Sequence, residues 1–318
     1  MRTLLTSALA LALATGVSAA DGFPPTPQAF SSFGATVSNG YAYVYGGHAG
    51  KTHSYSVDTT VGVLRRIKLD DPKTGWEELP GSEHLQGLAL VTYGDSVIRI
   101  GGMAPRNKAG EKSDNHSVAT VEKYEPARKA WTKLPDLPAP RSSHDAVVIG
   151  DTLYVFGGWQ MKGSEKTTWF NTGVKLDLTA KDAKWETVPQ PFLRRALTAA
   201  AFDGKVYVIC GLTEDGDTSH EINIYDPKTN SWSKGPDLPG EGMNGFTPAA
   251  CVANNKLYVS PADGALYKLT GDKWETCGKL EKGRWVHRMV TDGNGHLIVL
   301  GGASKGGNVS AVEVIEVK

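Results

Sequence analysis

The stretch "AWTKLPDLPAPRSSHDAVVIGDTLYVFGG" (residues 130–158) contains the pattern that decides the fold. Two apolar runs, "DAVVIG" and "DTLYVFGG", meet at a tight turn, and a tryptophan followed by Leu-Pro precedes them. Short runs of β-branched and aromatic residues bounded by Gly, Pro and Asp predict antiparallel strands joined by turns. The stretch therefore predicts the end of one small sheet and the beginning of the next.

The same landmarks recur along the 318-residue chain. Strands end in Gly-Gly at Gly46-Gly47, Gly101-Gly102, Gly157-Gly158 and Gly301-Gly302, and altered copies end at Cys210-Gly211 and Ser260-Pro261. A tryptophan follows each of the first five copies: Trp76, Trp131, Trp185, Trp232 and Trp274. The spacing of about 40 to 56 residues is typical of propeller repeats. The apolar runs between these landmarks predict four short strands in each unit.

One four-stranded sheet cannot bury both of its faces alone, whereas sheets arranged radially bury them against each other. The Gly-Gly strand ends, the tyrosines of "VEKYEP" and "INIYDP", and the tryptophan of the fourth strand resemble the signature of kelch repeats. The resemblance covers essentially the whole chain after residue 19. It implies an all-β, six-bladed kelch-type β-propeller with four antiparallel strands per blade.

The last unit stops after its third strand, in "VSAVEVIEVK". The missing strand is expected at the other end of the chain, because "FPPTPQAFSSFGA" (Phe23 to Ala35) aligns without a gap with "LPDLPAPRSSHDA" (Leu134 to Ala146). This register places Ala20 at the tryptophan position. We therefore expect the N- and C-terminal segments to pair and to close the ring, which removes an open sheet edge.

Residues 1–19 have the features of a cleaved signal peptide, with Arg2, an apolar run and small residues before position 20. We therefore expect a signal peptide at 1–19, a propeller at 20–318, and export to the periplasm or the extracellular space. The formal net charge is zero, which does not favour nucleic acid as a partner. No later apolar run is long enough to span a membrane, and a closed ring is expected to be a monomer.

Counting back sixteen residues from each Gly-Gly, with one residue inserted in the last unit, gives the position just before each innermost strand. The residues at this position are Phe30, Leu85, Arg141, Arg194, Asn244 and Arg284, with Arg195 and Arg288 close by. Two interpretations of the arginines remain open. They donate hydrogen bonds to neighbouring loop carbonyls, or they surround the channel mouth and bind a carboxylate or phosphate.

Three tryptophans, Trp159, Trp169 and Trp285, fall outside the fourth-strand positions. They lie on segments predicted to surround the channel, and large aromatic rings beside polar groups suit a sugar. The alternative is that they only cover blade ends. His48 and His53 are further candidates for ligand contact on this face. With no third ligand in view they are a weak metal signal, and neither a metal nor a cofactor is predicted.

Two functions of different classes are compatible with these features. The first is an exported binding or interaction propeller, whose channel face takes a glycan, an acidic sugar or another protein. The second is an isomerase, because "FPPTPQAFSSFGATVSNGYAYVYGGHAG" and "WETCGKLEKGRWVHRMV" resemble periplasmic N-acetylneuraminate epimerases, which are sialic acid mutarotases. That resemblance implies an arginine that holds the sugar carboxylate and a group that moves protons, for which His144, His287 and Glu214 are candidates. A kelch-type copper oxidase is disfavoured, because the three cysteines lie on predicted strands.

Overall fold

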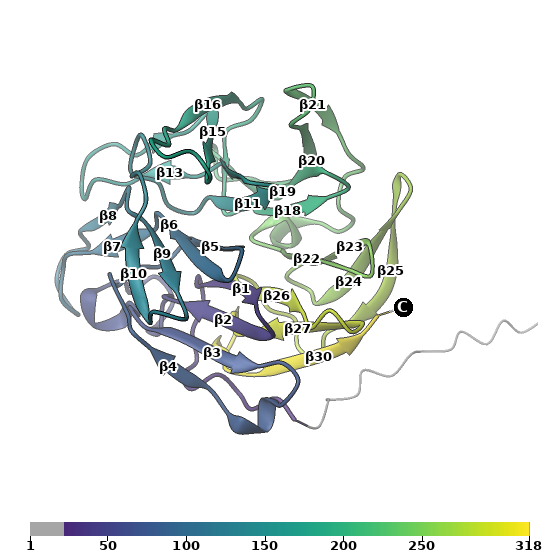
Figure 1. Cartoon of the computed structure of the whole chain (residues 1–318), viewed down its shortest axis with the longest axis horizontal. Coiled ribbons are helices and arrows are strands. Elements are labelled where there is room, and N and C mark those ends of the chain that lie inside the picture. Colours follow the sequence, from purple (N-terminus) through teal and green to yellow (C-terminus); the bar gives the residue numbers. More distant parts are fainter. Residues whose placement is uncertain (1–21, 318) are drawn as a thin grey trace, which may run out of the picture.

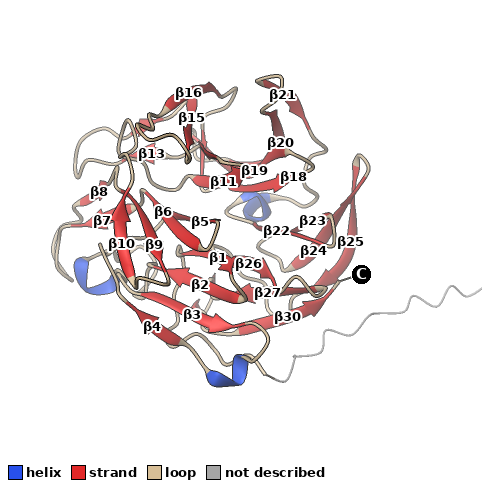
Figure 2. Cartoon of the chain, viewed as in Figure 1, coloured by secondary structure: helices blue, strands red, loops and turns tan. Residues whose placement is uncertain are grey.

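The computed structural model describes residues 22–317 and contains a ring of six β-sheets around a central channel (Figure 1). Strands dominate the molecule, and the helical segments are the short 3₁₀ turns η1 (Val57–Thr59), η2 (Pro72–Thr74) and η3 (Gly242–Gly245) (Figure 2). No helix within residues 22–317 has the length and apolar character needed to cross a membrane. The predicted propeller is confirmed.

Blades 1 to 3 each run from the innermost to the outermost strand along the sequence. Blade 1 consists of β1 (Gly34–Ser38), β2 (Tyr41–Tyr45), β3 (Leu64–Lys68) and β4 (Glu77–Leu79). Blade 2 consists of β5 (Ala89–Tyr93), β6 (Ser96–Ile100), β9 (Val121–Glu125) and β10 (Ala130–Lys133). Blade 3 consists of β11 (Asp145–Ile149), β12 (Thr152–Phe156), β15 (Thr172–Asp177) and β16 (Glu186–Pro189).

Blades 4 to 6 continue the same order. Blade 4 consists of β17 (Arg194–Arg195), β18 (Thr198–Phe202), β19 (Lys205–Thr213), β20 (Thr218–Asp226) and β21 (Ser231–Lys234). Blade 5 consists of β22 (Ala249–Ala253), β23 (Lys256–Ser260), β24 (Ala265–Thr270) and β25 (Lys273–Lys279). Blade 6 has three strands within the described residues, namely β26 (Arg288–Thr291), β27 (His296–Leu300) and β30 (Val312–Glu316).

Three small hairpins lie on one face of the ring, in the segments that connect the second and third strands of blades 2, 3 and 6. They are formed by β7 (Met103–Pro105) with β8 (Asn115–Ser117), β13 (Trp159–Gln160) with β14 (Thr168–Trp169), and β28 (Ala303–Ser304) with β29 (Gly307–Asn308). The first two hairpins are the most important for the candidate site, because β7 and β13 begin at the channel.

Six clusters of buried apolar side chains hold the blades together, and each cluster takes its residues from two neighbouring blades. The repeated tryptophans lie at these contacts. Trp131 of blade 2 packs its ring 5.4 Å from Tyr45 of blade 1 and 5.2 Å from Tyr124 of its own blade. Its indole Nε1 donates a hydrogen bond of 2.8 Å to the carbonyl of Pro80.

The Gly-Gly pairs mark places where neighbouring blades come too close for a side chain. Gly157 has a φ of +70°, and a Cβ there would lie 2.3 Å from Leu197 Cδ2 of blade 4. A Cβ on Gly158 would lie 2.7 Å from the carbonyl oxygen of Ser142. In blade 3, Gly157 thus leaves room for the neighbouring blade and Gly158 for the start of its own innermost strand.

Ring closure follows the predicted register. Trp76 Nε1 of blade 1 donates to the carbonyl of Pro24 at 3.4 Å, as Trp185 Nε1 donates to the carbonyl of Pro135 at 2.9 Å. Pro24 thus takes the position of Pro135, as the alignment of the two segments predicts.

A second bond confirms this register. The backbone N–H of Thr26 donates to the carbonyl of Ser310 at 2.8 Å, as the N–H of Leu137 donates to the carbonyl of Ala119. The N-terminal segment therefore lies beside the last strand of blade 6. Ala20, and with it the predicted outer strand, lies outside the described residues.

Candidate functional site

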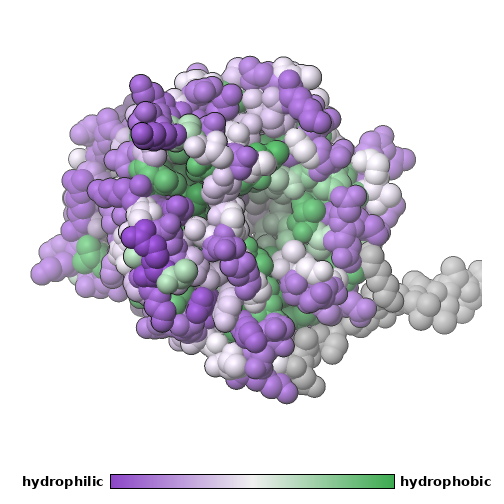
Figure 3. Space-filling view, viewed as in Figure 1, coloured by the Kyte–Doolittle hydropathy of each residue, from purple (hydrophilic) through white to green (hydrophobic). Residues whose placement is uncertain are grey.

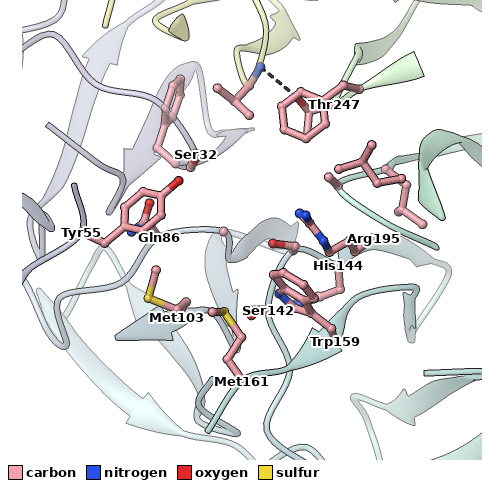
Figure 4. Close-up of a pocket in the computed structure, with 18 of the residues that line it drawn as sticks. Ser32, Tyr55, Gln86, Met103, Ser142, His144, Trp159, Met161, Arg195 and Thr247 are labelled. Atoms are coloured by element: carbon pink, nitrogen blue, oxygen red, sulfur yellow. Dashed lines mark hydrogen bonds between the residues drawn. The ribbon is translucent and has the colours of Figure 1, made fainter. Parts of the chain in front are cut away.

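A belt of residues in the left-handed conformation surrounds the channel at the start of the innermost strands. The belt consists of Ser32, Gly87, Ser143, Ala196, Thr247 and Val286, with φ between 43° and 58°. Each belt N–H except that of Val286 donates to the carbonyl of the preceding belt residue, at 2.7 to 3.3 Å. The N–H of Val286 donates instead to Thr247 Oγ1 at 3.0 Å, which Figure 4 marks with a dashed line. The belt is therefore a closed circle of hydrogen bonds that fixes where neighbouring side chains point.

A cavity of about 390 Å³ opens on the face that carries the hairpins. Its lining comes from all six blades and includes several belt residues. Figure 3 views the ring from the side opposite to Figure 4 and shows that the middle of the ring is hollowed there, with hydrophobic residues on the wall of the hollow and mostly hydrophilic residues around it. A cavity of this size falls in the range of small-molecule sites.

An ion pair between opposite blades crosses the channel at the base of the cavity. Arg288 at the start of β26 reaches Asp145 at the start of β11, with Nη1 3.0 Å from Oδ2. Arg288 also donates to the carbonyls of Phe33 and Leu88, and Asp145 accepts a bond from the hydroxyl of Thr198. These contacts join five of the six blades.

Arg141, Arg194 and Arg284 do not line the cavity; each points into its own blade. Arg141 donates to the carbonyls of Gly157 and Thr172 at 3.0 and 3.1 Å. Its guanidinium carbon lies 4.0 Å from the ring centre of Phe170. The guanidinium thus satisfies carbonyls where the strands of blade 3 end.

The other two arginines of this ring act in the same way. Arg194 donates to the carbonyl of Glu221 and to the side chain of Asn223, and Arg284 donates to the carbonyl of Gly301 and pairs with Glu313. The expectation that these three arginines share one anion site is therefore wrong. Their hydrogen bonds to the blades correspond to the other interpretation of the sequence.

Arg195 differs from its neighbour in the chain because its side chain lines the cavity. Its guanidinium carbon lies 3.8 Å from the ring centre of Trp159 and 5.7 Å from that of Trp169. Its side chain makes no hydrogen bond or ion pair within residues 22–317, and its Nε is buried without a partner. Burial lowers the pKa of Arg195 to about 10, so that it stays charged at neutral pH. The cavity thus contains a cation without a counter-ion.

The aromatic candidates divide into two groups. Trp159 lines the cavity, and Trp169 packs against it with ring centres 5.4 Å apart, through the pairing of β13 with β14. Trp285 does not line the cavity and forms an isolated bridge with Ala303. Figure 4 shows Trp159 and Arg195 on one side of the cavity and Tyr55 and Gln86 on the other.

His144 and His287 line the deeper part of the cavity but are buried, at 2% exposure each. Burial lowers the pKa of both imidazoles to about 3, and the nearby Arg288 adds to this effect. No hydrogen-bond partner within the described residues reaches their ring nitrogens. At neutral pH both rings are therefore uncharged, and neither suits the role of a general acid.

His48 and His53 lie in different surroundings. His53 lines the cavity, whereas His48 is buried in a loop of blade 1, where its Nε2 lies 2.9 Å from the carbonyl of Lys51. Glu214 is exposed at the tip of the turn between β19 and β20 and is not part of the lining.

Asn244 holds a loop together instead of facing the cavity. Its Nδ2 donates to Asp263 Oδ2 at 2.9 Å, and its Oδ1 accepts from the N–H of Asp263. In blade 5 the belt residue is Thr247, so that the residue two positions earlier is Gly245. The count from Gly-Gly is therefore one residue off in this blade.

Sequence reasoning missed most of the lining. The candidates that line the cavity are Arg195, Arg288, Trp159, His53, His144 and His287, and the residues that were missed include Tyr55, Gln86, Met103, Ser142, Met161 and Phe246. Gln86, Ser142, Arg195 and Phe246 all immediately precede a belt residue. A count one position further along the chain finds Gln86, Ser142 and Arg195, whereas in blade 5 it gives Gly245, one residue before Phe246. At this position the residue types differ from blade to blade.

Neither a carboxylate nor a thiol belongs to the lining. Within residues 22–317, no group of three or more His, Cys, Asp or Glu side chains is placed to hold a metal ion. The cavity therefore offers hydrogen-bond donors, aromatic rings, two thioethers and one unpaired guanidinium, and this set suits an acidic ligand with apolar faces.

Comparisons with known proteins agree with this architecture. The family model described as the KLHDC2/KLHL20/DRC7 Kelch-repeats domain matches residues 87–302. The Kelch-like protein terF of Aspergillus terreus is 27% identical over 68% of this chain and 46% of its own length. Kelch-like protein 15 of Danio rerio is 25% identical over 74% of this chain and 33% of its own length.

Two further relatives bear on the second functional hypothesis. The N-acetylneuraminate epimerase of Shigella sonnei is 34% identical over 40% of this chain and 33% of its own length. The chain therefore spans less than half the length of each of these curated relatives. The solved structure of YjhT superposes with a TM-score of 0.75, at 16% identity, over 93% of this chain and 97% of that one, which shows a shared fold.

Proposed function

Because the chain belongs to the kelch-repeat family, we propose that it is a binding module whose channel-face cavity takes a small acidic sugar. The observation that carries the proposal is Arg195, a charged guanidinium that lies on Trp159 in a cavity without a carboxylate. An arginine without a counter-ion favours a carboxylate on the ligand, and an aromatic ring beside it suits the apolar face of a sugar.

The other side of the cavity fits the same ligand class. Tyr55 and Gln86 supply polar groups that can bind sugar hydroxyls, and Met103 and Met161 supply apolar surface. Gln86 Nε2 and Trp159 Nε1 are buried without acceptors among residues 22–317. A ligand rich in oxygen acceptors would satisfy such donors better than an apolar one.

Calorimetry with glucuronate, N-acetylneuraminate and glucose tests this proposal. At least one of the two acids should bind about tenfold or more tightly than glucose, and Arg195→Met should remove that difference, since a charge-assisted hydrogen bond is lost. Arg128→Met, on an exposed turn of the opposite face, is the matched control. If no acidic sugar binds, or if Arg195→Met binds both acids as tightly as the unchanged protein, the proposal is wrong.

The second candidate function is a sialic acid mutarotase, and its support is the similarity to the epimerase of Shigella sonnei. Anomer exchange needs one group that takes the anomeric proton and another that protonates the ring oxygen. His144 and His287 are unsuited, because their pKa values lie near 3, which leaves His53 and Tyr55 among the lining residues. Proton NMR of N-acetylneuraminate anomers separates the two functions, since only an enzyme speeds the approach to anomeric equilibrium.

We also propose that the protein acts outside the cytoplasm as a monomer, on the basis of the signal-peptide features of residues 1–19 and of ring closure. N-terminal sequencing of the protein recovered from the periplasm or medium should give a chain that begins near Ala20. Recovery of the uncleaved chain in the cytoplasm would contradict export, and a dimer in sedimentation analysis would contradict the monomer.

A further inference from the structure

The rim of the cavity has two unlike sides. On blades 1 to 3 it rises into a structure that we call the wall, made of residues 50–58, the β7–β8 hairpin and the β13–β14 hairpin. On blades 4 and 5 the rim consists of the β19–β20 turn and of η3, and between these two sides blade 6 contributes the β28–β29 hairpin with the exposed Lys305. The wall begins at the cavity itself, since Met103, Trp159 and Met161 belong to both.

The wall is a continuous, hydrogen-bonded structure. The N–H of Ser117 donates to the carbonyl of Met161 at 3.0 Å, and this bond joins the two hairpins. The N–H of Val57 donates to the carbonyl of Asn107, also at 3.0 Å, and joins the blade 1 loop to the first hairpin. A surface tied in this way is ready to hold an extended ligand without first becoming ordered.

The wall carries more positive than negative charge. Its tips, in residues 50–58, 106–114 and 161–167, contain six basic residues against four acidic ones. The basic residues are Lys51, Arg106, Lys108, Lys112, Lys162 and Lys166. All six are exposed, and none makes an ion pair within residues 22–317.

Most of the acidic groups of the wall already have local partners. Asp58 accepts the N–H of Ala109, Glu111 accepts the N–H of Lys108, and Asp114 binds the imidazole of His116 at 2.7 Å. Backbone hydrogen bonds and a histidine therefore hold these carboxylates, which leaves the lysine ammonium groups free to meet an anionic ligand.

The opposite rim has the reverse charge. The β19–β20 turn carries Glu214, Asp215 and Asp217, and Glu241 precedes η3, all of them exposed. No lysine or arginine occurs in residues 213–218 or 239–247. A negatively charged chain that leaves the cavity is thus attracted toward the wall and repelled from blades 4 and 5.

We propose that the wall binds the continuing chain of an acidic oligosaccharide whose terminal sugar occupies the cavity. The proposal rests on the proposed function, since the terminal sugar uses the Arg195 site, and it adds the length and the direction of the ligand. The carboxylates of successive sugars would lie against the lysines of the two hairpins. A single-stranded nucleic acid fits less well, because it needs aromatic stacking platforms along its length. The tyrosine and tryptophans of the wall, Tyr55, Trp159 and Trp169, lie in or against the cavity, and the hairpin tips at 106–114 and 161–167 contain no aromatic residue.

The test uses 1,4-linked galacturonate of one, two, four and eight residues, with binding followed by calorimetry at low and at moderate salt. Affinity should rise with chain length, to about tenfold for the octamer over the monomer, since several exposed charge contacts each contribute a small factor. The gain should shrink at the higher salt concentration, because exposed ion pairs are screened.

The decisive variant is the quadruple substitution Lys108→Gln, Lys112→Gln, Lys162→Gln and Lys166→Gln. The monomer should bind it as it binds the unchanged protein, whereas the gain with chain length should fall to within about twofold. The matched control changes four exposed lysines on turns or strand ends of the opposite face: Lys73→Gln, Lys181→Gln, Lys228→Gln and Lys273→Gln. It makes the same change in net charge and should keep the full gain.

The outcomes separate this inference from the proposed function. If the monomer binds but affinity does not depend on length, or if the quadruple variant keeps the gain, the wall does not bind the chain. If no galacturonate of any length binds while N-acetylneuraminate does, the wall proposal is wrong and the cavity proposal stands. If the octamer binds Arg195→Met undiminished, the anchor in the cavity is wrong. Equal competition by oligothymidylate of the same charge would show attraction by charge alone and would overturn the assignment to an acidic oligosaccharide.

Discussion

Arg194 and Arg195 are neighbours in the chain but belong to different regions of the molecule. Arg194 is 2% exposed and donates to groups of its own blade, among them the side chain of Asn223. Arg195 lies in the cavity on the ring of Trp159 and has no polar partner within the described residues. The left-handed residue that follows, Ala196, holds both in place through the belt.

This difference applies to the whole ring. At the position of Arg194 an arginine occurs in three blades, and each of these arginines stabilises the strand ends of its blade. At the position of Arg195 the residue types vary, and several of them line the cavity. Recurrence between the repeats of one chain thus marks the framework, and variation at the next position marks the candidate site. The predictions below test this division.

The largest effect is expected for Arg284→Ala, because it breaks a buried ion pair. Glu313, whose side chain is 7% exposed, would lose its cation and keep a bond from the N–H of Glu281. Loss of one partner of a buried pair typically costs about 3–5 kcal/mol. Urea unfolding measures the change, and Arg128→Ala on an exposed turn should stay within about 0.5 kcal/mol of the unchanged protein. A loss below about 1 kcal/mol for Arg284→Ala would place this arginine outside the framework.

The second effect tests an exception to the division. Asp145 and Arg288 depart from the repeat, because the residue at this position of the innermost strand is charged only in blades 3 and 6. Their contacts nevertheless join five blades below the cavity. Asp145→Asn keeps the shape and removes the charge, and it should cost about 2–3 kcal/mol in urea unfolding, the value of a hydrogen bond to a charged group. Arg128→Ala again serves as the control. An unchanged unfolding midpoint would mean that the pair does not stabilise the ring.

The sequence predicts the framework, which recurs from blade to blade, better than it predicts the candidate site, which does not. The tryptophans and the Gly-Gly pairs recur because every blade packs against its neighbour in the same way. They therefore predict the blades and the register with which the ring closes at Pro24. The direction of the arginines depends on the belt, whose members Ser32, Gly87 and Val286 share a backbone conformation but no residue type. The wall is built from the connections between second and third strands, which differ in length and sequence from blade to blade. Its hydrogen bonds between blades therefore could not be read from the repeat.

The third effect concerns pH. His144 takes the ring position that Leu88 and Leu197 take in other blades, and burial lowers its pKa to about 3. The unfolded chain binds a proton near pH 6.5, whereas the folded protein does so only near pH 3, so that stability is full above about pH 6.5 and is lost as the pH falls between these values. At pH 5.5 the loss amounts to about 1.4 kcal/mol for this histidine.

The variant His144→Leu should therefore lose less stability between pH 7.5 and pH 5.5 than the unchanged protein. Thermal or urea unfolding at the two pH values gives the comparison. His53→Leu is the matched control, because His53 is exposed in the folded protein. If His144→Leu and the unchanged protein lose the same amount, then His144 is protonated in the folded state and the cavity base is open to water.

The smallest effect tests whether the closing seam belongs to the framework. Trp76 donates to Pro24 across the seam at 3.4 Å, and Trp131 makes the same bond to Pro80 between ordinary blades at 2.8 Å. Replacement of either residue by Phe keeps an aromatic ring and removes the donor, and a net loss of about 1 kcal/mol is typical. Because the bond at the seam is the longer one, Trp76→Phe should cost the same as or less than Trp131→Phe in urea unfolding. A greater cost at Trp76, or an earlier separate transition in Trp76→Phe but not in Trp131→Phe, would show that the ring opens at this seam first and that closure differs in kind from the contacts between the other blades.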